Sequence, residues 1–395
     1  MKKVLFIICS FLIFTFNVNA FELSSKNVVL YNMNDNTIVY ELNKDKTTSI
    51  ASLTKIMTTL VAIENISNYD EKITINNNMF IGLREANAAV IGLKNMQIVT
   101  YNDLLYGMFL SSGADATRAI AISIAGNEES FVELMNKKAK EIGMLNTHFE
   151  NTVGLDNINH YSTVNDVALM LKYALNNSKF KEIFLSESYS FSDNSLTVYS
   201  TTRKTAHKYN YNINYIEGAK TGYTDDAGKC LASLAYDNVN NIEYLLVTTG
   251  ASTNTNDAYH IKDATSIYSY YFENYKYYNL VNMGDIILRL PIKYGKEEML
   301  NIYASNDIKI YYDKSFNKEN IDIKYNGIDE LNPSMKENTK LGEIEILYDN
   351  EVVDKFDIFL TKKIDFSLYK FVIGNYLYIT IGIVIILIII KFIKR

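Results

Sequence analysis

The feature that most constrains this chain is an uncharged apolar run near the C-terminus, residues 371–390. A helix of about 20 residues spans about 30 Å, which is the thickness of the hydrocarbon core of a bilayer. Lys391, Lys394 and Arg395 follow the run, and basic residues tend to stay on the cytoplasmic side. The run therefore predicts a C-terminal transmembrane helix with the rest of the chain outside. A buried core helix is the alternative.

The N-terminus has the layout of a secretory signal peptide. Lys2 and Lys3 precede an apolar stretch, residues 4–16, and Val-Asn-Ala at 18–20 resembles a cleavage site. We therefore expect residues 1–20 to be a signal peptide, with an uncleaved N-terminal anchor as the alternative. The two ends together predict an exported protein that its C-terminal helix holds at the outer face of a membrane.

Composition argues against several classes of function. The 39 Lys and Arg against 45 Asp and Glu give a net charge of −6, whereas a nucleic-acid-binding protein needs a basic face. The two cysteines cannot form a disulfide framework, since Cys9 lies in the predicted signal peptide. The four histidines lack the spacing of a zinc site. We therefore expect no nucleic acid, no metal and no cofactor.

The segment between the two ends divides into two regions with different sequence patterns. Strand patterns come first, helical periodicities follow, and two strands and a helix close the first region, an order typical of an α+β domain whose sheet joins both ends of the segment. Its strands are expected at 28–31, 37–40, 230–236 and 242–249, and its helices at 52–64, 103–110, 115–125, 130–142, 164–175 and 257–275.

After about residue 279 short alternating segments predict a small all-β domain, which we interpret as a spacer or docking module. Its strands are expected at 285–290, 300–304, 308–312, 321–325, 342–347 and 352–360. The predicted division is 1–20 signal peptide, 21–278 first domain, 279–366 β-rich domain and 371–390 transmembrane anchor.

A serine and a lysine at the start of the helix at 52–64 can form a nucleophile and its base. Ser52 and Lys55 fall on one face of that helix. A serine hydroxyl needs a base, and a lysine serves as one only when desolvation or a second cation lowers its pKa. The same spacing recurs at 178/181, 315/318 and 367/370, so by itself it has little weight.

Two further clusters follow Ser52 in order. Ser-Gly-Ala-Asp at 112–115 begins 60 residues later (112 − 52), and Lys-Thr-Gly at 220–222 begins 108 residues after that (220 − 112). The second cluster, which we expect just before a strand, is the only Lys-Thr-Gly in the chain. Motifs of these types characterise penicillin-binding proteins and class A β-lactamases.

On these motifs the chain resembles a serine-type D-alanyl-D-alanine carboxypeptidase of the peptidase S11 family, a low-molecular-mass penicillin-binding protein. The resemblance covers nearly the whole mature chain. It implies a β-lactamase/transpeptidase-like catalytic domain, with helices and a helical insertion on an antiparallel sheet, followed by the β-rich domain. It also implies anchorage in the bacterial cell membrane, peptidoglycan stem peptides as substrates and β-lactams as inhibitors.

The resemblance implies a role for each motif residue. Ser52 would attack the bond between two terminal D-alanines, Lys55 would take its proton, and Ser112 with Lys220 would pass a proton to the leaving D-alanine. The backbone N–H groups of Ser52 and Tyr223 would form the oxyanion hole. The residues expected to bind the substrate are Lys220, Thr221, Gly222, Tyr223 and Thr224.

Two positions depart from the family pattern. Ala114 stands where the family usually has an asparagine that bridges the catalytic lysine and the substrate. His260 stands where an arginine often helps to bind a substrate carboxylate. A DD-endopeptidase, or an attenuated or inactive wall-binding homologue, is therefore an alternative. A weak β-lactamase is another, although we find no convincing Glu-x-x-Leu-Asn motif near Glu150.

Overall fold

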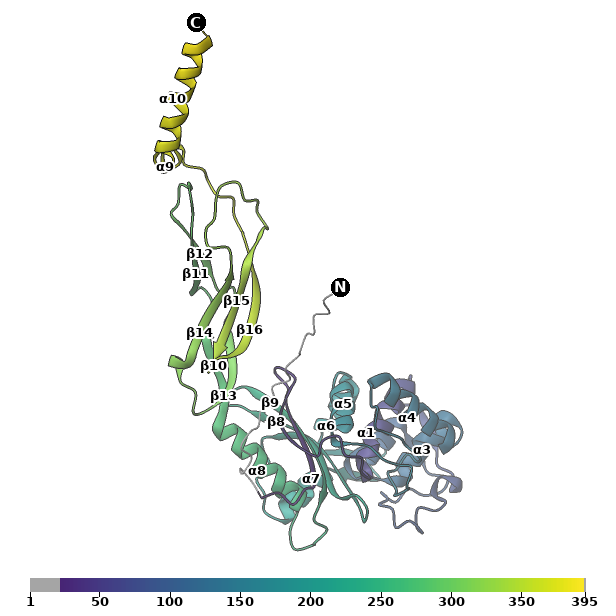
Figure 1. Ribbon diagram of the computed structural model, residues 1–395. Coiled ribbons are helices and arrows are strands. Elements are labelled where there is room, and N and C mark those ends of the chain that lie inside the picture. Colours follow the sequence, from purple (N-terminus) through teal and green to yellow (C-terminus); the bar gives the residue numbers. More distant parts are fainter. Residues whose placement is uncertain (1–21, 394–395) are drawn as a thin grey trace, which may run out of the picture. The chain divides into compact units, whose positions relative to one another are not determined.

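The computed structural model describes residues 22–393. The predicted signal peptide and the terminal pair Lys394 and Arg395 lie outside the described residues. The chain forms two compact units that meet between Glu273 and Asn274 (Figure 1).

The first unit is built on a five-stranded antiparallel sheet with the order β2-β1-β9-β8-β7. Its strands are β1 (Asn27–Asn32), β2 (Thr37–Leu42), β7 (Ile216–Thr224), β8 (Gly228–Asp237) and β9 (Ile242–Ala251). β1 pairs with β9, so the two ends of the unit meet in the sheet, as the order of strand and helix patterns predicted. β7 forms one edge of the sheet, which leaves one side of its backbone free of a neighbouring strand.

Helices cover both faces of this sheet. Figure 1 shows α5 and α6 on one side and α8 on the other, where the Tyr268 hydroxyl lies 2.9 Å from Ser233 Oγ of β8. The helices are α1 (Thr54–Asn65), α2 (Tyr101–Leu110), α3 (Ala114–Ala125), α4 (Glu128–Ile142), α5 (Val164–Leu175), α6 (Ser178–Leu185), α7 (Thr201–Lys208) and α8 (Tyr259–Asn274). Shorter elements are η1 (Ala51–Leu53), η2 (Asn77–Phe80), β3 (Lys72–Thr74), β4 (Ile98–Thr100), β5 (Ser188–Ser190) and β6 (Thr197–Tyr199). The six predicted helices are confirmed, whereas α6 and α7 were not predicted.

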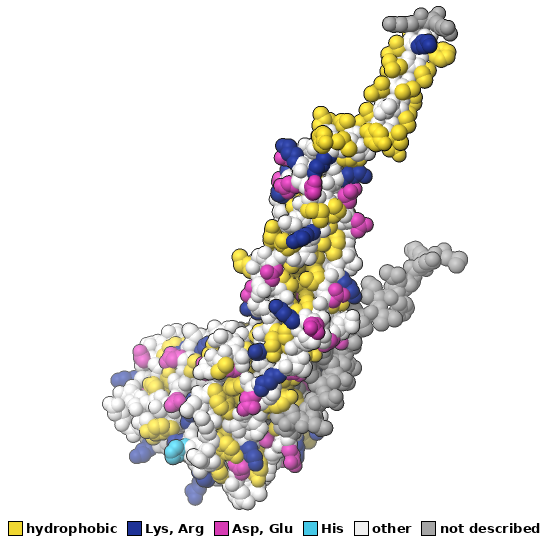
Figure 2. All heavy atoms as spheres, turned by 90° about the vertical axis from the view of Figure 1, so that its left-hand side faces the viewer, with side chains coloured by type: hydrophobic (Ala, Val, Ile, Leu, Met, Phe, Trp, Pro, Cys, Tyr) yellow, Lys and Arg dark blue, Asp and Glu magenta, His cyan; other side chains and the backbone are white. Residues whose placement is uncertain are grey.

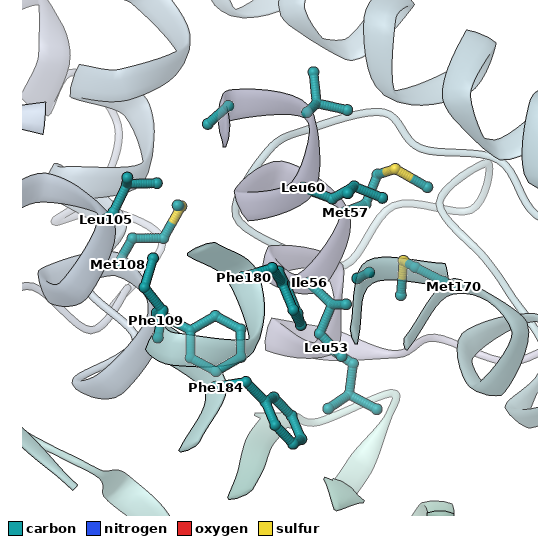
Figure 3. Close-up of a cluster of buried hydrophobic side chains, with 14 of the residues drawn as sticks. Leu53, Ile56, Met57, Leu60, Leu105, Met108, Phe109, Met170, Phe180 and Phe184 are labelled. Atoms are coloured by element: carbon teal, nitrogen blue, oxygen red, sulfur yellow. The ribbon is translucent and has the colours of Figure 1, made fainter. Parts of the chain in front are cut away.

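The helix α1 runs through the centre of the core. Every residue from Thr54 to Ile63 is buried. Figure 3 shows Leu53 and Ile56 beside Phe180, Phe109 and Phe184, which come from α2 and α6. Burying one such side chain contributes about 1.5–3 kcal/mol. The core therefore fixes the start of α1 in place.

The second unit has its own core and three small antiparallel sheets, which confirms the predicted all-β domain. The strands are β10 (Tyr275–Val281), β11 (Ile286–Pro291), β12 (Met299–Tyr303), β13 (Ile308–Asp313), β14 (Ile321–Gly327), β15 (Lys340–Tyr348) and β16 (Glu351–Phe359), and η3 (Lys318–Asn320) precedes β14. β10 pairs with β13. It was not predicted, because its tyrosine-rich pattern continues the helical periodicity of α8.

The C-terminal apolar run forms two helices instead of one, α9 (Leu368–Gly374) and α10 (Tyr376–Ile393). Asn375 separates them with the non-helical dihedrals φ −117° and ψ 14°. α10 has 18 residues and a mean hydropathy of 2.6, and its length and composition suit a membrane span. The apolar helix α10 thus begins at Tyr376, five positions after the start of the predicted transmembrane helix.

Candidate active site

Ser52 and Lys55 lie at the start of α1, where η1 leads into the helix. Lys55 Nζ is 2.9 Å from Ser52 Oγ and donates to the Val153 carbonyl oxygen at 2.7 Å. Lys55 is 1% exposed. Ala51 adopts a φ of +47°, a conformation that residues with a Cβ rarely adopt. This turn leads directly into the serine.

Lys220, Thr221 and Gly222 lie inside β7, an edge strand that the sequence analysis did not predict, and they precede the predicted strand at 230–236, which became β8. The strand was missed because Gly218 and Gly222 interrupt its pattern, and glycine disfavours strands. A Cβ on Gly222 would lie 3.0 Å from Ser52 N and 3.2 Å from the Ile50 carbonyl oxygen. The glycine therefore lets the edge strand lie close against η1.

We expect Gly222→Ala to lower the rate of acylation by a labelled penicillin about 10- to 100-fold, because the added methyl must displace the backbone that carries Ser52. The rate of labelling and the melting temperature, measured together, test this. Gly382→Ala is the control, since a Cβ there meets nothing within 4 Å. An unchanged rate would mean that η1 moves freely.

Ser112 lies between α2 and α3 and completes the group of motif residues. It adopts a φ of +58°. Its Oγ lies 3.1 Å from Lys220 Nζ, which also donates to the Thr221 carbonyl oxygen at 2.9 Å. The structure thus brings two serine–lysine pairs, predicted from segments far apart in the sequence, to one place.

Burial controls the charge of both lysines. Desolvation lowers the pKa of Lys55 well below its ordinary value, and the charge of Lys220 lowers it further, against a smaller opposing effect of Asp115. Desolvation also lowers the pKa of Lys220 to about 7. A neutral Lys55 can accept a proton from Ser52, and Lys220 can carry charge near neutral pH.

A cleft of about 920 Å³ opens beside these residues. Its lining includes Ser52, Lys55, Ser112, Thr221, Gly222, Tyr223 and Thr224. Lys220 is fully buried behind it. The Thr224 hydroxyl donates to Asp156 Oδ1 at 2.6 Å, and Thr221 Oγ1 lies 2.7 Å from Thr201 Oγ1. The Tyr223 side chain is exposed, and its hydroxyl donates to Asp225 Oδ1 at 2.7 Å.

The cleft also contains cations that the sequence analysis missed. Lys208 and Lys229 line it, and Lys229 Nζ donates to the carbonyl oxygens of Asn254 and Asp257 at 2.6 and 2.8 Å. His260 lines the cleft as well, but burial lowers its pKa to about 4, so it is neutral. Lys229 pairs with Tyr223 in the hairpin of β7 and β8, and β7 carries Lys-Thr-Gly. Recognition of this hairpin in the sequence would have identified Lys229.

Ala114, the departure from the usual asparagine, is fully buried and packs in a small apolar cluster with Leu83 and Val153. Its N–H donates to the Ala89 carbonyl oxygen at 2.7 Å. The neighbouring Asp115 carboxylate accepts hydrogen bonds from the backbone of residues 91–93. These bonds fix the loop whose residues 86–89 line the cleft.

Within residues 22–393 no three His, Cys, Asp or Glu side chains are grouped so as to hold a metal ion. Cys230 is a buried free thiol whose pKa burial raises to about 12, which makes it a packing residue.

Comparison with known proteins gives a consistent result. Residues 14–253 match the family described as D-alanyl-D-alanine carboxypeptidase, peptidase S11, and residues 275–365 match the C-terminal domain of penicillin-binding protein 5. The chain is 28% identical over 335 residues to D-alanyl-D-alanine carboxypeptidase DacF of Bacillus subtilis, with 83% of each chain covered.

Two solved structures share the fold. Penicillin-binding protein 5 from Haemophilus influenzae aligns with a TM-score of 0.63 at 24% identity, over 87% of this chain and 98% of that one. The Streptomyces K15 DD-transpeptidase aligns with a TM-score of 0.57 at 27% identity, over 64% of this chain and 98% of that one. The first unit therefore has the transpeptidase-like fold that the motifs predicted.

Proposed function

The chain belongs to the peptidase S11 family of D-alanyl-D-alanine carboxypeptidases, and we propose that it removes the terminal D-alanine from peptidoglycan stem pentapeptides through an acyl-enzyme on Ser52. The observation that carries the proposal is the 2.9 Å distance between Ser52 Oγ and the buried amine of Lys55, in a cleft that Ser112 also lines.

In the first step Ser52 Oγ attacks the carbonyl carbon of the terminal peptide bond, and the neutral amine of Lys55 takes the hydroxyl proton. The oxyanion accepts hydrogen bonds from the backbone N–H groups of Ser52 and Tyr223, and such preorganised donors stabilise the charge that develops. The C–N bond then breaks, and Ser112, bonded to Lys220, delivers a proton to the leaving amine. Water then attacks the ester carbon and gives a proton back to the Ser112–Lys220 pair, while protonated Lys55 returns its proton to the leaving Ser52 Oγ.

The free carboxylate of the terminal D-alanine needs positive charge in the cleft. Lys220 and Thr221 bind it in this proposal, and Lys208 and Lys229 add charge in the same cleft, where His260 is neutral. Thr224 contributes only if its hydroxyl turns away from Asp156. A β-lactam presents an equivalent bond and a carboxylate, so it acylates Ser52 and inhibits the enzyme.

Mass spectrometry of a pentapeptide incubated with the full-length chain in detergent tests the activity. The expected result is the loss of one alanine. A cross-linked stem peptide in the same assay tests the alternative of a DD-endopeptidase, which would separate the two peptides. Cleavage of neither substrate, together with no penicillin labelling, would favour an inactive wall-binding homologue.

The alternative of an attenuated enzyme depends on Ala114. We expect Ala114→Asn to destabilise the chain by about 1–3 kcal/mol, because the amide would enter a fully buried apolar cluster. D-alanine release should stay close to the wild-type rate, because Ala114 is buried and is not among the residues that line the cleft. Thermal unfolding and the release assay measure the two effects. A large rise in release would instead identify Ala114 as the cause of an attenuated site.

We also propose that the protein is exported and anchored at the outer face of the bacterial cell membrane by α10. The length and apolar composition of α10 support the anchor, and the basic residues after it support the orientation. This location would place the catalytic unit on the side of the membrane where the peptidoglycan lies.

A further inference from the structure

The short helix α9 exposes an apolar surface immediately before the proposed membrane span. No residue of α9 is buried, and Leu368 and Tyr369 are 67% and 74% exposed. Lys370 is the only charged residue in the helix. Figure 2 shows that hydrophobic side chains also cover much of the visible face of α10. An apolar surface of this kind marks an interaction site, because soluble surfaces rarely carry one.

Tyr294, in the turn between β11 and β12, makes several of the contacts that hold α9 to the β-rich unit. The Tyr294 carbonyl oxygen accepts a hydrogen bond from Ser367 N at 2.8 Å, and its hydroxyl accepts one from Asn375 Nδ2 at 2.8 Å. Its ring packs edge-on against Phe371 with centroids 5.1 Å apart. Tyr294 therefore contacts the residues that flank α9 at both ends and one residue within it.

Two further features show that this connection is tight. A Cβ on Gly374 would lie 2.9 Å from Tyr294 Cε1, so the last turn of α9 approaches the ring closely. Tyr294 itself adopts a φ of +60°, a conformation that costs energy in a non-glycine residue and that its contacts must offset. Lys370 Nζ lies 3.7 Å from Glu298 Oε1, so its charge points toward the β-rich unit.

α10 by itself is long enough to cross the membrane. Its 18 residues give about 27 Å, close to the thickness of the hydrocarbon core. α9 is therefore not needed as part of the span, and the break at Asn375 separates it from the span. The exposed tyrosines Tyr369, Tyr376 and Tyr378 lie around this break, and tyrosine concentrates at the level of the lipid headgroups.

We propose that α9 lies in the outer interfacial layer of the lipid bilayer and that Tyr294 clamps the β11–β12 turn of the β-rich unit onto it. This inference depends on the membrane anchor proposed above and is independent of the catalytic proposal. The occupant of the apolar surface is lipid because the surface continues into the span. The clamp makes the base of the β-rich unit a rigid membrane-surface element instead of a freely hinged one.

The chain contains no tryptophan, so a single introduced tryptophan reports membrane depth without background. Tyr369→Trp, Leu387→Trp and Tyr303→Trp, each in the full chain, are reconstituted in vesicles whose lipids carry bromine near the headgroup or near the chain end. We expect Tyr369→Trp to be quenched most by shallow bromine and Leu387→Trp most by deep bromine. Tyr303 is an exposed residue of β12, and the fluorescence of Tyr303→Trp should be quenched by neither.

Each other outcome overturns a defined claim. If Leu387→Trp is quenched and Tyr369→Trp emits as in water, α9 is not interfacial but the anchor stands. If the emission of Tyr369→Trp is unquenched yet blue-shifted, a protein surface such as a second copy covers α9, and lipid does not. If Leu387→Trp is unquenched as well, the anchor itself fails.

Hydrogen exchange of α9 in the reconstituted chain tests the clamp. Tyr294→Ala should raise the exchange rate of the backbone amides of residues 371–374 at least about tenfold, because the contacts of the Tyr294 ring and hydroxyl are lost together. Tyr294→Phe removes only the hydroxyl and should have a smaller effect, and Tyr303→Ala is the control. Unchanged exchange in Tyr294→Ala, with the β-rich unit still folded, would overturn the clamp.

Discussion

Ser52→Ala is expected to abolish labelling by a fluorescent penicillin and to lower D-alanine release by at least about 10³-fold. The hydroxyl oxygen is the atom that forms the covalent bond, and removal of a nucleophile in a serine hydrolase typically costs several orders of magnitude. Ser52 is partly accessible in the cleft, and no packing requirement opposes its replacement by alanine. The measurement is gel fluorescence of labelled chains together with mass spectrometry of the peptide product.

A second serine provides a matched control for this variant. Ser178 precedes Lys181 with the same spacing and begins α6. Ser178→Ala should label and turn over as wild type does, because its helix is capped by the side chain of Asn177. Labelling that persists in Ser52→Ala would refute the acyl-enzyme on Ser52, and equal loss in both variants would indicate an effect on folding.

Lys55→Arg is expected to lower the acylation rate at least about 10³-fold at neutral pH. A guanidinium stays protonated in proteins, so it cannot take the proton of Ser52. Lys181→Arg, at the other spacing of the same type, should leave the rate unchanged. The rate of penicillin acylation, followed by stopped-flow or timed labelling, measures the effect. Retention of the wild-type rate would exclude Lys55 as the base.

The same assignment predicts the pH dependence of wild type. The active form of Lys55 is neutral, so the acylation rate should fall as the pH falls through the lowered pKa of Lys55. The rate should already be at its maximum at pH values well below the ordinary pKa of a lysine. Lys220 is needed as a cation, so kcat/KM for a carboxylate substrate should fall as the pH rises through about 7. The pH profile of D-alanine release measures both limbs. A rate that rises only near the ordinary lysine pKa would contradict the lowered pKa of Lys55.

Much of the fold was visible in the sequence because it depends on local periodicity. The strands that became β1, β2, β8 and β9 alternate or are continuously apolar, and the six predicted helices have long apolar faces. α6 and α7 are only eight residues long, and β7 contains two glycines. These elements exist because they pack against the sheet and the core, and that contribution has no local signal.

The candidate site divides in the same way. Residue type and motif order identified Ser52, Lys55, Ser112 and Lys220 as a group. Only the structure identified three further groups at the site, because they lie near it in space and belong to no motif. They are Lys208, Lys229 and the Val153 carbonyl oxygen. The environment of Ala114 also came from the structure, since only packing specifies that its methyl group is buried beside Leu83 and Val153.

The sequence by itself determined the residue types that can react, the family and the apolar C-terminal segment, because these depend on composition, order and periodicity along the chain. Only the tertiary structure decided that Lys55 and Lys220 are buried, since desolvation is set by neighbours that come from distant segments. It also decided where the C-terminal run breaks into α9 and α10, because the contacts of Tyr294 with Phe371 and Asn375 join residues that are far apart in the sequence.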